Sequence, residues 1–241
     1  MKVYTNERRV KRNRLQQFVA VFANTALLLV GLFAVMLVGT TVIAPQIASS
    51  PVLIIAIGLL STLIGVQAGN EISRMGIPHE ALNDGLRGLG ADTALYHYTL
   101  PADHVLVTPR AVYSLTVRPQ QISVSFDGNR LTVHDALHRR FMRTLTQQRL
   151  GNPVAQAQRD AAAVQRWLKD NLGADISVQP AIVFTNPSAE LEIEGSPSVP
   201  ILRADKRKPS LKAFVRESGT REGRTHTVDL DALNAALGLT T

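Results

Sequence analysis

The chain has 241 residues, a length that suits one or two domains, and it carries a net charge of +7. It contains no cysteine, which excludes disulfide bonds, thiolate metal sites and cysteine nucleophiles. The excess charge lies at one end: residues 1–17 hold six basic side chains and one acid, whereas the chain from residue 70 onward holds 20 basic and 18 acidic ones. The positive charge is therefore weak support for a nucleic-acid-binding domain, and better placed to set a membrane topology. The six basic residues are Lys2, Arg8, Arg9, Lys11, Arg12 and Arg14.

A long uncharged stretch follows this basic tail, because residues 18–69 contain no Asp, Glu, Lys, Arg or His. Two apolar runs within it, about 18–43 and 52–69, approach or exceed the ~20 residues that a helix needs to cross a bilayer core. The first run is much longer than the apolar stretch of a signal peptide. The break between the runs is short, so the two helices must be antiparallel. We therefore predict a basic cytoplasmic tail (1–17) and a transmembrane hairpin (18–69) in the cytoplasmic membrane, with both termini in the cytoplasm.

Small residues recur at every fourth position in both apolar runs. This spacing lets helix backbones approach closely, either within the hairpin or between two copies of the chain. The predicted partners of this segment are thus the lipid bilayer and, as an alternative, a second copy in a homo-oligomer. The residues are Gly31, Val35 and Gly39 in the first run and Ser61, Gly65 and Gly69 in the second.

From residue 70 the composition becomes that of a globular domain, which we place at 70–225, with a short C-terminal helix in 226–241. Asn152 is placed to cap a long helix over 153–172, and Gly173 to end it. Residues 195–225 are predicted to be irregular and partly disordered. The order of elements predicts an α/β domain with one mixed, mostly antiparallel sheet flanked by helices. The other predicted elements are a helix over 78–89 and strands over 93–100, 104–108, 111–117, 122–126, 130–133 and 176–186.

Three stretches of this domain resemble the nuclease-related domain (NERD) of many bacterial proteins, a divergent branch of the PD-(D/E)xK nuclease fold. Residues 99–120, TLPADHVLVTPRAVYSLTVRPQ, resemble the family's strand pair, whose second strand ends in Glu-x-Lys. Residues 151–156, GNPVAQ, resemble its Asn-Pro-x-x-Gln helix start, and residues 181–187, AIVFTNP, resemble a later buried strand. The resemblance implies a restriction-endonuclease-like α/β fold and Mg²⁺-assisted cleavage of phosphodiesters, in which clustered carboxylates hold the metal.

The resemblance also implies a set of site residues. Glu80, with His79 equally close, takes the place of the family's helix glutamate, and Asp103 that of its strand aspartate. These two residues are the implied metal ligands. Thr116 and Arg118 take the Glu-x-Lys positions, and Gln156 takes the place of the motif glutamine.

The Glu-x-Lys positions depart from the family pattern. Thr116 supplies a neutral hydroxyl where a carboxylate is expected, and Arg118 cannot exchange a proton near neutral pH. We therefore predict a non-catalytic binding or scaffold module without a cofactor, at the cytoplasmic face of the membrane. The alternative is a membrane-tethered nuclease that uses Mg²⁺ and acts on DNA or RNA.

Two further patterns bear on partners. Basic residues gather at 139–149 and at 203–224, where anionic lipid headgroups, nucleic acid or another protein are the candidate partners. His134 and His138 lie four residues apart, but the glutamate and third ligand of a zinc-protease helix are missing. We interpret this histidine pair as part of a solvated surface.

Overall fold

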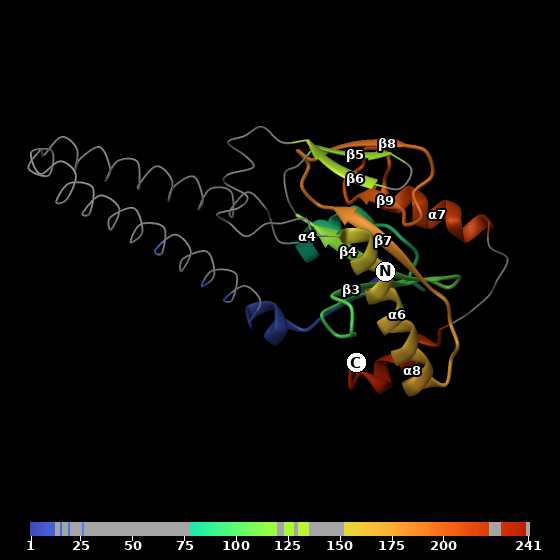
Figure 1. The fold of residues 1–241 in the computed structure, drawn as a ribbon. Coiled ribbons are helices and arrows are strands. Elements are labelled where there is room, and N and C mark those ends of the chain that lie inside the picture. The colour runs from blue at the N-terminus through green and yellow to red at the C-terminus, as the bar shows by residue number, and fades with distance from the viewer. Residues whose placement is uncertain are drawn as a thin grey trace, which may run out of the picture. The chain divides into compact units, whose positions relative to one another are not determined.

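The structure is a computed structural model that describes residues 1–12, 15, 19, 26, 78–119, 123–127, 130–134, 152–221 and 228–239 (Figure 1). The chain divides into two compact units, and the first unit (1–10, 75–135 and 150–241) holds every element discussed below. No helix in the described part of the chain is both long and apolar enough to cross a membrane. The two predicted spans, 18–43 and 52–69, lie outside the described residues except for Val19 and Ala26.

Two sheets form the framework of this unit. The larger has six strands in the order β1-β2-β3-β4-β7-β9, and the smaller has three in the order β6-β5-β8. The prediction of an α/β domain with a mixed sheet flanked by helices is confirmed, but the prediction of one sheet was wrong. The strands of the larger sheet are β1 (Lys2–Thr5), β2 (Ala94–His97), β3 (His104–Val107), β4 (Val112–Arg118), β7 (Val178–Phe184) and β9 (Ile201–Arg203). Those of the smaller sheet are β5 (Ser123–Asp127), β6 (Arg130–His134) and β8 (Glu190–Glu194).

Strand direction follows from the connections. Strands β2, β3 and β4 are antiparallel neighbours joined by short loops, as are β5 and β6. In contrast, β4 pairs with β7, β7 with β9, β1 with β2, and β5 with β8 in parallel. The sheets are therefore less antiparallel than predicted, because most of these parallel partners are separated by long crossover segments.

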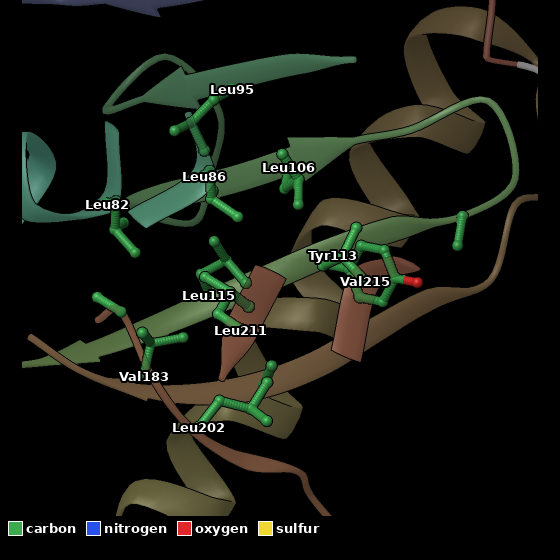
Figure 2. Packing of buried hydrophobic residues seen from close by; sticks show 13 residues of the cluster. Leu82, Leu86, Leu95, Leu106, Tyr113, Leu115, Val183, Leu202, Leu211 and Val215 are labelled. Carbon is green, nitrogen blue, oxygen red and sulfur yellow. The ribbon is translucent and has the colours of Figure 1, made fainter. Parts of the chain in front are cut away.

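Helices cover both faces of the larger sheet. One face packs against α4 (Pro78–Leu86) and α7 (Leu211–Arg221), and the other against α6 (Pro153–Leu172) and α8 (Leu230–Ala236). Figure 2 shows the first core, where apolar side chains from α4, β3, β4, β7 and α7 converge. Successive residues of a strand point to opposite faces of the sheet, so the side chains of β4 alternate between the two cores. Tyr113 and Leu115 enter the α4 core, and Val112 enters the α6 core.

The long helix α6 runs across the face of the larger sheet that is opposite α4 and α7 (Figure 1). It has the predicted bounds because its ends are well specified. The Asn152 side chain accepts a hydrogen bond from Ala155 N at 3.0 Å, Pro153 occupies the first turn, and Gly173 adopts the left-handed conformation with φ 63°. Its buried stripe includes Ala157, Ala161, Val164 and Leu168, as the helical periodicity predicts.

Two segments differ from the sequence-based expectation. Residues 2–5, predicted as part of a tail, form strand β1 in the larger sheet. The expectation of an irregular, partly disordered segment over 195–225 was wrong for its described part, since this part contains β9 and α7. Its apolar residues are too few and too interrupted to show a period, yet Ile201, Leu202 and Leu211 are buried by neighbours distant in sequence.

Candidate functional site

Strand β4 presents one row of polar side chains toward α6. Ser114, Thr116 and Arg118 alternate with the apolar residues of the α4 core and therefore share the opposite face. Thr116 is buried, with 4% of its surface exposed, and Ser114 is fully buried. Thr116 and Arg118, which the resemblance assigns to the Glu-x-Lys positions, thus lie at the contact between β4 and α6 within the chain.

Two hydrogen bonds join this row to α6. The hydroxyl of Thr116 donates to Asp160 Oδ2 at 3.3 Å, and Nη2 of Arg118 donates to Gln156 Oε1 at 2.7 Å. Gln156 and Asp160 lie four residues apart, which places them on one side of the helix. Both motif positions of β4 are therefore bound by side chains of α6.

Asp103 directly precedes β3 and lies beside this group. Strands β3 and β4 pair Val105 with Ser114, and continuing this antiparallel register by two residues puts Asp103 opposite Thr116. Desolvation raises the pKa of Asp103, Arg9 lowers it, and the negative charge of Asp160 raises it. Asp103 as a whole residue is exposed, and its carboxylate feels the charges of both Asp160 and Arg9.

Among the residues that the structure describes, two buried polar atoms of the row have no hydrogen-bond partner, namely Ser114 Oγ and Arg118 Nε. Burial lowers the pKa of Arg118, and the nearby charge of Asp160 opposes that change. A guanidinium remains charged in proteins at neutral pH, so Arg118 is a half-buried fixed cation. The Nη1 of Arg118 donates to the carbonyl oxygen of Val117 at 3.3 Å.

The donor set does not fit the Mg²⁺ that the family resemblance implies. Mg²⁺ requires oxygen ligands in near-octahedral geometry and is held by carboxylates together with waters and substrate phosphates. Thr116 contributes a neutral hydroxyl whose proton is used toward Asp160. Within the described ranges, no group of three or more Asp, Glu or His side chains is arranged to hold a metal.

The structure brings four of the five predicted site residues together. Asp103, Thr116, Arg118 and Gln156 lie on the α6 face, whereas Glu80 is exposed in the first turn of α4, which packs on the opposite face. Sequence reasoning missed Asp160. The available signal was its position one turn after Gln156, on the partly buried edge of an amphipathic helix.

A second polar cluster lies on the α4 face of the sheet. His97 and His104 are buried, and their Nδ1 atoms are 2.8 Å apart, so one ring donates a proton and the other accepts it. The Nε2 of His97 lies 3.1 Å from the Asn83 side-chain oxygen. With that oxygen as acceptor, His97 donates through Nε2 and His104 donates through Nδ1 to His97. Burial lowers the pKa of His97 to about 4 and that of His104 to about 3.

Comparison with known families supports the resemblance for the central part of the domain. Residues 89–185 match the family model of the nuclease-related domain. The matched range runs from before β2 to just after β7, so it includes Asp103, Thr116, Arg118, Gln156 and Asp160 but not Glu80. Searches of curated proteins and of solved structures give no match.

Proposed function

We propose that this chain is a membrane-anchored, nuclease-related protein whose domain binds a partner or acts as a scaffold without cleaving phosphodiesters. One observation carries the proposal: Thr116 and Arg118 are both engaged by α6, through Asp160 and Gln156. These are the positions at which the family resemblance places a metal-binding glutamate and a catalytic lysine. In this protein both side chains hold a strand against a helix.

The chemistry of the two replacements supports the same conclusion. A threonine hydroxyl carries no charge to offset that of a divalent ion, and here it donates a hydrogen bond instead of accepting a metal. A lysine near a scissile phosphate can lose or gain a proton, but an arginine cannot do so near neutral pH. Arg118 can therefore position an anionic group but cannot carry out proton transfer.

The membrane anchor is supported by the two apolar runs and by the position of β1. Strand β1 precedes the uncharged stretch and β2 follows it, yet Lys2–Thr5 pair with Ala94–His97 in one sheet. Both ends of the stretch must then lie on the same side of any membrane that it crosses, as a hairpin requires. Leu15 and Val19, four residues apart in helical conformation, are 63% and 55% exposed, which suits a surface that meets lipid. The basic residues before the runs favour the cytoplasmic side.

The partner is proposed to carry negative charge. Lys206 and Lys208 are exposed shortly before α7, whereas Arg207 between them is held by Asp205 and by the carbonyl of Pro187. Anionic lipid headgroups are the favoured class, because a membrane anchor would keep this surface close to the bilayer.

A cleavage assay on the full chain in nanodiscs tests the proposal. Labelled DNA and RNA would be incubated with Mg²⁺ or Mn²⁺, and we expect the substrates to remain intact. Metal-dependent cleavage that disappears in Asp103→Asn would contradict the proposal. That result would favour the alternative, a membrane-tethered nuclease, for which the proximity of Asp160 to Asp103 is the specific support.

Restoring the missing carboxylate provides a complementary prediction. Thr116→Glu adds a third carboxylate beside Asp103 and Asp160, and we expect this variant to gain saturable Mn²⁺ binding that the wild type lacks. Titration followed by electron paramagnetic resonance measures free Mn²⁺ directly. Thr132→Glu is the matched control, since it adds the same charge at an exposed position of β6. Equal binding by the two variants would mean that the site is not where the resemblance places it.

A further inference from the structure

The N-terminal segment is an integral part of the domain that carries the candidate site. Strand β1 pairs in parallel with β2 along its whole length, from Lys2 with Ala94 to Thr5 with His97. The pairing continues beyond both ends of the strand: Lys2 N donates to Thr93 O at 2.8 Å, and Asn6 N donates to His97 O at 3.0 Å. Residues 1–6 are thereby held in fixed register against β2.

A helical turn begins where β1 ends. The side-chain oxygen of Asn6 accepts from Arg9 N at 3.2 Å, and its carbonyl accepts from Val10 N at 3.1 Å. Asn6 thus acts as the N-cap of the helical residues 7–12. This cap turns the chain directly after the last β-sheet contact and places Arg9, which is half-buried, in the first helical turn.

The loop between β2 and β3 brings Asp103 to the same place. Tyr98 follows His97 directly and adopts a left-handed conformation with φ 59°, which is uncommon for a residue with a side chain. Its N–H donates to the carbonyl of Asp103 at 2.7 Å and closes the loop. A path of three hydrogen bonds therefore connects Arg9 to Asp103. It runs from Arg9 to Asn6, from Asn6 to His97, and from Tyr98, the neighbour of His97, to Asp103.

The charges around the loop agree with this geometry. Burial raises the pKa of both Asp103 and Tyr98, and the positive charge of Arg9 opposes the rise in each. This agrees with the hydrogen-bonded path that brings Arg9 to the loop. Asp160 acts on Asp103 in the opposite direction. The group thus contains two carboxylates, Asp103 and Asp160, and two guanidinium groups, Arg9 and Arg118.

We propose that Arg9 supplies the positive charge that a divalent cation would supply to these carboxylates in a metal-dependent nuclease. The two carboxylates of the wild-type site are then partly neutralised by a residue that precedes the apolar runs in the chain. This inference rests on the proposed non-catalytic function and gives it a physical cause beyond the loss of the motif glutamate. Arg9 is a residue that neutralises the site, and the proposal gives it no part in catalysis.

Mn²⁺ titration of the full chain in nanodiscs tests the inference. Arg9→Gln removes the charge and keeps a polar side chain of similar length, and we expect it to gain saturable Mn²⁺ binding that is at least about tenfold tighter than any weak binding by the wild type. The matched control is Arg8→Gln, which makes the same change in net charge at an exposed neighbour in the same turn. Arg9→Lys keeps the charge and is expected to behave like the wild type. Adding Asp103→Asn to Arg9→Gln should abolish the gain.

Equal Mn²⁺ affinity in the Arg8 and Arg9 variants would overturn the inference and leave the proposed function intact. Mn²⁺-dependent cleavage by the wild type would instead contradict the proposed function. Fluorescence of Trp167, the single tryptophan, shows whether each variant is folded, because this residue packs against the core under α6. If Arg9→Gln does not fold, Mn²⁺ binding by the wild type is compared with that by Asp103→Asn. Binding by the wild type that is lost in Asp103→Asn would contradict the inference.

Discussion

At the scale of single residues, the candidate site shows which contacts a sequence can predict. Thr116, Arg118 and Gln156 could be identified because they lie in short local motifs, and the structure places them in one group. Asp160 lies in no such motif, although its spacing from Gln156 was a usable signal. The proposed contribution of Arg9 depends on the pairing of β1 with β2, which are about ninety residues apart in the sequence, and no local pattern encodes it.

The buried histidine pair predicts a dependence of stability on pH. The pKa values of His97 and His104 are about 4 and about 3 in the folded chain, below the ordinary 6.5. As pH falls below 6.5 the unfolded chain therefore binds protons before the folded one does, and stability is lost. Above pH 6.5 the contribution of the neutral histidine pair to the free energy of unfolding is fully present. Below pH 6.5 this contribution decreases, until the pH reaches the folded pKa values of about 4 and about 3. Each histidine contributes a slope of at most about 1.4 kcal/mol per pH unit.

Urea unfolding monitored by Trp167 fluorescence at pH 7 and pH 5 measures this slope. The double variant His97→Gln/His104→Gln is expected to be less stable at pH 7 but to lose less stability on acidification. His79, which faces the pair from α4, stays in both proteins. An unchanged slope in the double variant would show that other groups cause the acid sensitivity.

At the scale of elements, strong end signals made some boundaries predictable. Helix α6 has a capping asparagine, a first-turn proline and a terminal glycine, and its bounds match the prediction. Strands β1 and β9 are short, with four and three residues, and lack such signals. They exist because the sheet provides hydrogen-bond partners, which is a tertiary effect that local propensity does not report.

The contact between α4 and the chain after β9 depends on one glycine. A Cβ atom added at Gly85 would lie 2.0 Å from the carbonyl oxygen of Ala204, and backbone cannot move aside cheaply. We expect Gly85→Ala to destabilise the domain by about 1–3 kcal/mol, the usual cost of overpacking. Gly90→Ala is the control, because its added Cβ would meet nothing within 4 Å. Urea midpoints of the two variants would be compared, and equal midpoints would show that α4 can shift away from Ala204.

At the scale of the whole molecule, the sheet constrains the topology of the chain. The pairing of β1 with β2 requires residues 1–10 and the domain after residue 75 to lie on one side of any membrane that the apolar stretch crosses. Because the chain has no cysteine, single-cysteine reporters give clean labelling. We expect Arg8→Cys and Asp231→Cys, both at exposed positions, to react with an impermeant maleimide only after the membrane is opened. Labelling of one but not the other in sealed spheroplasts would exclude the hairpin arrangement.

The parallel pairing of β1 with β2 also has a consequence for biosynthesis. Lys2 leaves the ribosome about ninety residues before its partner Ala94. Contacts of such large sequence separation form late in folding. The edge of the sheet next to β2 therefore stays incomplete until the intervening apolar stretch has been synthesised and placed. In the proposed membrane-anchored protein, completion of the sheet would report that the apolar stretch has returned the chain to the side of the membrane on which it began.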